Sequence, residues 1–105
     1  MFTHLHLHTQ YSLLEGAIRV KQLAKVLKER GFSACAITDH GNLFGAVEFY
    51  QALEKENLKP LIGLGAFVSE VPLAEHPDPN ANLRYFHTQL LCQNRQGYQN
   101  LAYLA

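Results

Sequence analysis

The chain has 105 residues, 48% of them hydrophobic, and its nine basic side chains balance nine acidic ones. This length supports one domain with a small core, and the zero net charge excludes the broad positive surface typical of proteins that grip nucleic acid by its phosphates. No apolar stretch approaches the roughly 20 residues of a membrane span, and no signal peptide opens the chain, so we expect a soluble, cytoplasmic protein with no membrane partner.

The chain opens with a predicted strand and a predicted helix. Residues 2–8 have the two-residue period of a strand, which places the three histidines on one face and Thr3, Leu5 and Leu7 on the other. Residues 17–30 carry apolar side chains at the spacing of an amphipathic helix, and Gly31 stands where a left-handed C-cap is expected.

Two more strands with a helix between them follow. Residues 34–38 form a short apolar run typical of a covered parallel strand. Residues 43–56 again have helical spacing, with Asn42 as the expected N-cap. Pro60 begins the third predicted strand, at 60–68.

The last part of the chain combines a loop, a strand and a helix. Residues 69–83 are rich in Pro, Asn, Asp and Glu, which predicts a surface loop. Residues 84–92 have the β-branched and aromatic content of a fourth strand. A turn at NRQG then leads into a helix over 98–105.

The alternation of strands and helices predicts an α/β fold with parallel strands, in the form of a sheet or a TIM-like barrel. A closed barrel needs roughly 250 residues, so the chain is expected to supply about half of one. We therefore predict one partial domain over 1–105, with no second domain and with unpaired strand edges that favour self-association.

Polar residues fall where the predicted strands end. His6 and His8 end the first strand, Asp39 and His40 follow the second, and His87 lies on the fourth. Because functional groups gather at the carboxyl ends of parallel strands, these side chains are expected to meet at one rim. Neutral imidazole is a ligand for zinc, manganese and iron, so the pattern predicts a metal site.

Each of these residues also has a simpler interpretation. The histidines at positions 4, 6 and 8 are also compatible with the polar face of a half-exposed strand. Asp39 is also a candidate for closing a turn, and His40 for a solvated loop residue. His87 fits a hydrogen-bonded core histidine, and Cys35 and Cys92, which lie in apolar runs, fit buried thiols in a reducing compartment.

Four segments of the chain carry a family pattern in order and spacing, namely HLHLHTQYSLLEGA, AITDHGNLFGAVEFYQ, LKPLIGLGAFV and FHTQLLCQNRQGYQNLAYLA. They resemble the PHP (polymerase and histidinol phosphatase) domain, in the branch found at the N-terminus of the α subunit of bacterial DNA polymerase III. The resemblance covers essentially the whole chain, and TDHGNLFGAVEFY and GYQNL favour the polymerase branch.

The resemblance implies a distorted (β/α)₇ barrel whose rim binds up to three divalent ions for phosphoester hydrolysis. The ions would be zinc or manganese, with magnesium as a third candidate. Carried over position by position, the implied metal ligands are His6, His8, Glu15, Asp39, His40 and His87. Further ligands of the family lie beyond residue 105.

Gly65 departs from the family pattern, because a Gly-x-Glu motif places a glutamate there. Two divalent ions about 4 Å apart repel by roughly 17 kcal/mol at an effective dielectric constant near 20, and a bridging carboxylate offsets this repulsion. Gly65 provides no carboxylate. We therefore expect one weakly held ion and little or no phosphoesterase activity from this chain alone.

For function, the resemblance implies a segment of a DNA-directed DNA polymerase that serves DNA replication and supports proofreading. The implied partners are DNA, through the parent polymerase, and other replicase subunits such as the proofreading exonuclease. Two alternatives stay open. One is a stand-alone phosphoesterase of the histidinol-phosphatase type, and the other is a degenerate PHP scaffold without catalytic activity.

Overall fold

The computed structural model describes residues 2–13, 16–69 and 85–105. The elements in this part of the chain are α1 (Val20–Glu29), β1 (Ala34–Ile37), α2 (Ala46–Lys55), β2 (Lys59–Ser69), β3 (Tyr85–Leu91) and α3 (Arg95–Leu104). The strands predicted at 34–38, 60–68 and 84–92 are thus confirmed to within one residue at each end. The loop predicted at 69–83 lies outside the described residues, apart from its first residue.

Both crossover helices end in the same way. Gly31 has a φ of +80°, its N–H donates to the Lys28 carbonyl, and the next N–H, of Phe32, reaches back to Leu27. This pattern is the Schellman motif, so the C-cap glycine predicted from the sequence is confirmed. Asn57, with a φ of 60°, has the same place after α2, where Leu58 N–H donates to the Leu53 carbonyl.

The starts of the helices are less well predicted. α1 begins at Val20 and not at residue 17, because Ile18 is extended and its carbonyl accepts a hydrogen bond from Gln10 N–H. Asn42 does not cap α2, which begins at Ala46; the Asn42 side chain instead accepts from Phe44 N–H.

α3 also starts away from its predicted position. It begins at Arg95, inside the predicted turn, because the Asn94 side chain accepts the Gly97 N–H in a cap that starts the helix early.

The sheet has the order β1-β2-β3. β1 pairs with the first half of β2 in parallel, and β3 pairs with the second half of β2 in antiparallel, from Gly63 opposite Leu91 to Ser69 opposite Tyr85. The prediction that all strands are parallel is therefore wrong for β3. A parallel connection needs a crossover of a dozen or more residues, usually helical, and the sequence between β2 and β3 has no helical pattern.

The segment 2–8 runs parallel beside β1 but is not a regular strand. Ala36 N–H donates to the His4 carbonyl and Thr38 N–H donates to the Leu7 carbonyl. The donors are two residues apart and the acceptors three, so one extra residue interrupts the ladder. The pairing of this segment with β1 is reduced to a single bridge, between His4 and Cys35. The prediction of a regular strand at 2–8 is therefore wrong.

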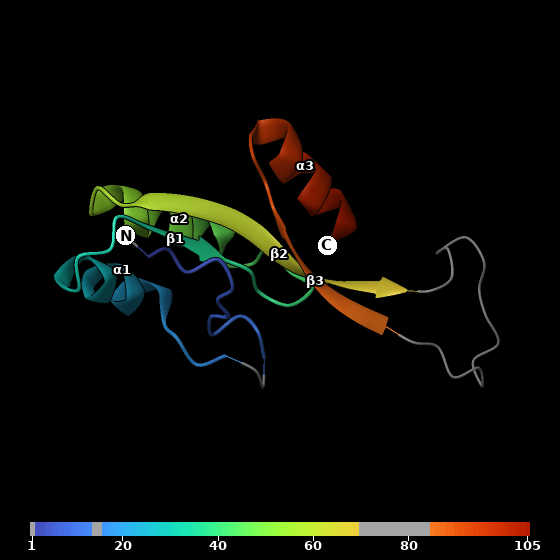
Figure 1. The fold of residues 1–105 in the computed structure, drawn as a ribbon, viewed down its shortest axis with the longest axis horizontal. Coiled ribbons are helices and arrows are strands. Elements are labelled where there is room, and N and C mark those ends of the chain that lie inside the picture. Colours follow the sequence, from blue (N-terminus) through green and yellow to red (C-terminus); the bar gives the residue numbers. More distant parts are fainter. Residues whose placement is uncertain (1, 14–15, 70–84) are drawn as a thin grey trace.

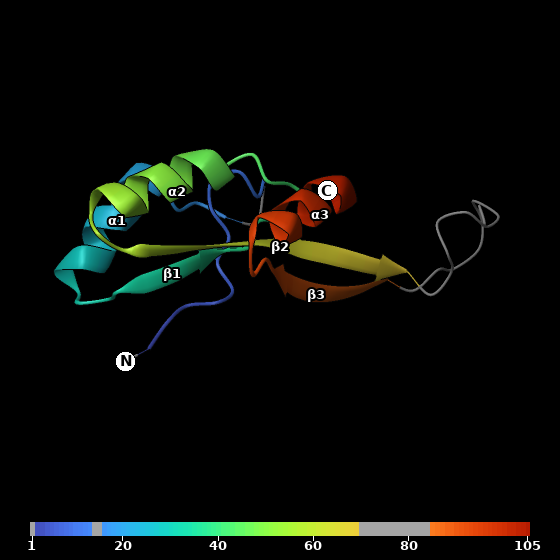
Figure 2. The same cartoon turned by 90° about the horizontal axis from the view of Figure 1, so that it is seen from above.

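Helices α2 and α3 lie on the same side of the sheet (Figure 2). The core between helices and sheet contains Phe49 and Leu53 of α2, Val20 of α1 and Cys35 of β1, all fully buried. Burial raises the pKa of the Cys35 thiol to about 11, as expected for a buried thiol, whereas Cys92 is half-buried.

The second half of β2 and the first half of β3, which pair with each other, project beyond α1 and α2 (Figure 1). Phe67 and Val68 of β2 and Phe86 of β3 are exposed on this hairpin. Over the described ranges, no helix combines the length and the apolar character that crossing a membrane requires.

Candidate functional site

Four imidazoles gather at the end of the sheet where β1 stops, and we refer to His6, His8, His40 and His87 as the histidine cluster. The Nε2 atoms of His6 and His8 are 3.0 Å apart. The His8 and His40 ring centroids are 4.4 Å apart, and those of His40 and His87 are 5.3 Å apart in a stacked arrangement. Side chains from the N-terminal segment, the loop after β1 and β3 therefore meet, as the sequence predicts.

His87 joins the cluster because β3 is antiparallel to β2. It lies opposite Phe67, near the start of β3 and near the end of β2, and the two ring centroids are 4.6 Å apart. An antiparallel strand brings its beginning to the edge where its neighbour ends. The predicted meeting place is therefore reached by a different topology, and His87 is exposed and not the core histidine of the simpler interpretation.

Gly65 gives His40 its place in the cluster. The two residues form an isolated parallel bridge, in which Gly65 N–H donates to the Asp39 carbonyl and Gly41 N–H donates to the Gly65 carbonyl. A Cβ atom on Gly65 would lie 2.7 Å from Cδ2 of His40. Gly65, the expected departure from the family pattern, is thus the residue that lets the His40 ring lie against β2.

Asp39 lies beneath the cluster and is 1% exposed. Its Oδ1 atom accepts from Thr9 N–H at 2.6 Å and from the Ser12 hydroxyl at 2.7 Å, and its Oδ2 atom accepts from the Thr9 hydroxyl at 2.7 Å. We call Asp39, Thr9 and Ser12 the carboxylate network. The partners of Asp39 come from a segment 27 to 30 residues away, so its carboxylate ties the N-terminal segment to the end of β1 and does not close a local turn.

Two residues of the predicted first segment and the loop after it remain, His4 and Glu15. His4 lies apart from the cluster, with its ring centroid 4.8 Å from Phe2 and 5.3 Å from Phe32, so the three histidines of the first segment do not act as one face. Glu15 lies outside the described residues. The roles of the cluster residues and of Asp39 as metal ligands stay predictions.

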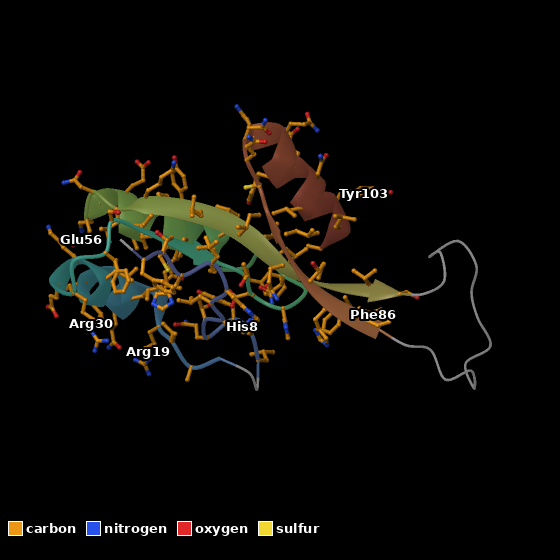
Figure 3. The ribbon with its side chains drawn as sticks, viewed as in Figure 1. His8, Arg19, Arg30, Glu56, Phe86 and Tyr103 are labelled. Carbon is orange, nitrogen blue, oxygen red and sulfur yellow. The ribbon has the colours of Figure 1, made fainter. Side chains whose placement is uncertain are left out.

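The arrangement of His6 and His8 suits one metal ion. Their Nε2 atoms converge, and Nδ1 of His8 lies 3.3 Å from the Ser12 hydroxyl, which is how a polar partner orients a ligating imidazole in metal proteins. Figure 3 shows His8 near the loop that follows β1. Within the described ranges, no group of three or more His, Cys, Asp or Glu side chains has the arrangement of a formed metal site.

Sequence reasoning missed the two hydroxyl residues of the carboxylate network. Thr9 and Ser12 directly follow the histidine pair in HTQYS, and both are at most 1% exposed. The signal available in the sequence was the presence of two small hydroxyl residues directly after a candidate ligand pair. A cavity of about 310 Å³ beside His40, whose lining includes Tyr11, Phe44 and Phe67, also has no signal in the sequence.

Comparisons with known proteins show the family of this chain. A family model described as PHP domain matches residues 4–105. The DNA polymerase III subunit alpha of Campylobacter jejuni is 49% identical over 104 residues, covering 99% of this chain and 8% of that protein. The subunit from Thermus aquaticus is 47% identical over 107 residues, covering 99% of this chain and 9% of that protein.

A solved structure has a similar fold. It is described as a metal-dependent phosphoesterase from Bifidobacterium adolescentis, with a TM-score of 0.60 and 21% identity over 96% of this chain and 32% of that one. The chain thus spans about a third of the solved structure and less than a tenth of the length of these two polymerase subunits.

Proposed function

The chain belongs to the PHP domain family and matches the N-terminal PHP region of bacterial DNA polymerase III alpha subunits, and from this we propose that it serves a replicative DNA polymerase. The observation that carries the proposal is identity of 47 to 49% over nearly the whole chain. The polymerase activity, the DNA substrate and partners such as a proofreading exonuclease are part of this proposal.

A stand-alone phosphatase is not favoured, because the relatives described above are polymerase subunits. In the proposed parent protein, the sheet of residues 1–105 continues into a distorted (β/α)₇ barrel. The projecting β2–β3 hairpin supports this, since its exposed Phe67, Val68 and Phe86 have apolar surface that further structure would cover.

We further propose that the rim binds a single divalent ion through His6 and His8. Imidazole nitrogen suits zinc better than magnesium, which prefers oxygen ligands. A bound zinc ion lowers the pKa of its water towards neutrality and so supplies hydroxide. Gly65 offers no carboxylate to bridge a second ion, and the Asp39 oxygens already accept three hydrogen bonds.

Little phosphoesterase activity follows from this donor set. A centre with two or three ions places one ion on the attacking oxygen and another on the leaving oxygen, and a single ion held by two imidazoles does not do both. The chain's own residues would orient His8 through Ser12 and hold His40 against Gly65. The PHP segment would then support the polymerase without being an efficient hydrolase itself.

Zinc titration of the full chain by calorimetry tests the metal proposal. We expect a single weak site, lost or weakened at least about tenfold in His8→Ala. The matched control is His4→Ala, which removes an imidazole outside the cluster and should bind as the unmodified chain does. Absence of zinc binding would instead support the non-catalytic scaffold.

Hydrolysis of p-nitrophenyl phosphate with Mn²⁺ or Zn²⁺ tests the activity proposal. We expect turnover close to the background of the metal alone. Robust turnover that His8→Ala abolishes would overturn the proposal that the chain is a poor hydrolase. The reading frame beyond Ala105 tests the polymerase assignment, because it should continue into polymerase sequence.

A further inference from the structure

Ser12 connects the buried carboxylate to the histidine cluster. Its hydroxyl oxygen lies 2.7 Å from Oδ1 of Asp39, 3.3 Å from Nδ1 of His8 and 3.0 Å from the backbone nitrogen of His40. The side chain is 1% exposed, so these contacts are made away from solvent. One hydroxyl thus joins the buried acid, one imidazole and the backbone of another.

The direction of each hydrogen bond follows from what each group can donate. An ionised carboxylate accepts hydrogen bonds and does not donate them, so the Ser12 hydroxyl uses its single O–H to donate to Asp39. The backbone N–H of His40 is a donor, so it donates a hydrogen bond to the Ser12 oxygen. In the remaining contact, between Ser12 Oγ and Nδ1 of His8, the Ser12 oxygen therefore accepts, and Nδ1 of His8 must carry the proton that it donates.

This direction passes on to His6. With its proton on Nδ1, a neutral His8 has a lone pair on Nε2, and that atom lies 3.0 Å from Nε2 of His6. Only a protonated Nε2 on His6 completes this contact as a hydrogen bond. The order of donors is therefore His6 to His8, His8 to Ser12, and Ser12 to Asp39.

We propose that Ser12 is a positioning residue that fixes His8 in the Nδ1–H tautomer and keeps its Nε2 lone pair directed towards His6. The charge of Asp39 determines the tautomer through the Ser12 hydroxyl, which lies between the Asp39 carboxylate and the His8 ring. The tautomer itself follows from the hydrogen bonds alone. Its use in metal binding rests on the function proposed above, because Nε2 is the atom that would bind the ion.

A purely structural role for Ser12 is the competing explanation. Its backbone does shape the loop, since Ser12 N–H donates to Thr9 and Gly16 N–H donates to the Ser12 carbonyl. Thr9 offers a matched comparison, because its hydroxyl also donates to Asp39 and also receives a backbone N–H, that of Tyr11. The hydrogen-bond partners of the Thr9 hydroxyl are Asp39 and the Tyr11 N–H and include no imidazole, so losing this hydroxyl should not change His8.

Nitrogen-15 NMR of histidine rings in the metal-free full chain tests the proposal, at a pH where imidazole is neutral. We expect His8 to be the Nδ1–H tautomer and His6 the Nε2–H tautomer. Ser12→Ala should lose the preference at His8, Ser12→Thr should restore it, and Thr9→Val should leave it unchanged. An Nε2–H tautomer of His8 in the unmodified chain, or an Nδ1–H tautomer kept by Ser12→Ala, would overturn the proposal.

Zinc titration of the same variants gives a second readout. Ser12→Ala should weaken zinc binding about 10- to 100-fold, as losses of orienting partners do, whereas Thr9→Val should bind as the unmodified chain does. Equal weakening in both would overturn a specific role of Ser12. If the unmodified chain binds no zinc, the metal proposal fails while the tautomer spectrum still decides the role of Ser12. If Ser12→Ala does not fold, the spectra of the unmodified chain and of Ser12→Thr decide it.

Discussion

The carboxylate network and the histidine cluster are neighbours, but the fold holds them in different ways. Asp39 is 1% exposed and accepts three hydrogen bonds from Thr9 and Ser12, so its position is fixed by directional contacts inside the protein. His6 and His87 are exposed, and His87 contacts the rings of His40 and Phe67. The comparison indicates that directional hydrogen bonds fix the carboxylate network beneath the site. The imidazoles that would contact a ligand are held by fewer such contacts.

Replacing Asp39 gives the largest expected effect and tests this comparison directly. Asp39→Ala leaves the Thr9 N–H and the two hydroxyls buried without their acceptor. Since each buried donor left without a partner costs about 1–3 kcal/mol, we expect a loss of at least about 3 kcal/mol in the free energy of unfolding. Urea denaturation followed by circular dichroism measures it.

His87→Ala is the matched variant from the histidine cluster. Its ring is exposed and contributes ring contacts, so we expect a loss of about 1 kcal/mol or less. If the two variants lose similar amounts of stability, the distinction between a rigid support and a loosely held cluster is wrong.

The sequence predicted the histidine cluster better than its support. His6, His8 and His40 were identified because histidines at predicted strand ends are conspicuous and strand ends converge. His87 was identified on its strand, but it reaches the cluster because β3 is antiparallel, which the sequence did not predict. The network was missed because Asp39 interacts with residues 27 and 30 positions earlier, and a local pattern does not report such a pairing. The same limit applies to β3, whose direction depends on how the chain returns after β2.

Alanine at Gly65 is the next test, because it acts on the contact between sheet and cluster. The added Cβ would lie 2.7 Å from Cδ2 of His40 and 3.1 Å from the Thr38 carbonyl oxygen. Overpacking of this kind costs about 1–3 kcal/mol. We expect that loss in urea denaturation and a smaller one when Gly65→Ala is combined with His40→Ala, since the double variant removes the closest contact.

Gly31→Ala is the control for a change at glycine itself. Gly31 has a φ of +80° and no neighbouring atom within 4 Å of an added Cβ, so its loss of about 1 kcal/mol should come from the backbone and be unaffected by His40→Ala. Additive losses for Gly65→Ala and His40→Ala would contradict a steric contact. Gly65→Glu needs the same Cβ, so introducing the glutamate that the family resemblance implies should displace His40 before it completes a metal site.

The smallest expected effect concerns the hydrogen bond by which Tyr11 connects the carboxylate network to α2. Tyr11 follows the network, where its N–H donates to the Thr9 hydroxyl, and its own hydroxyl donates to Glu48 of α2 at 2.6 Å. The hydrogen bond to Glu48 raises the pKa of Tyr11 above its ordinary value of 10.0, with smaller contributions from burial and from the charges of Glu48 and Asp39. The folded state thus favours the neutral phenol.

Because the folded pKa is raised, this stabilisation is fully present below the unfolded pKa and is lost as pH rises through the folded one. The urea midpoint of the unmodified chain should therefore fall above about pH 10. Tyr11→Phe should have a lower midpoint at neutral pH and a shallower alkaline fall. Cys35 and Tyr50, whose pKa values are also raised, contribute in both proteins, so the difference between the two curves isolates Tyr11. Parallel curves would mean that the contact with Glu48 does not extend the support to α2.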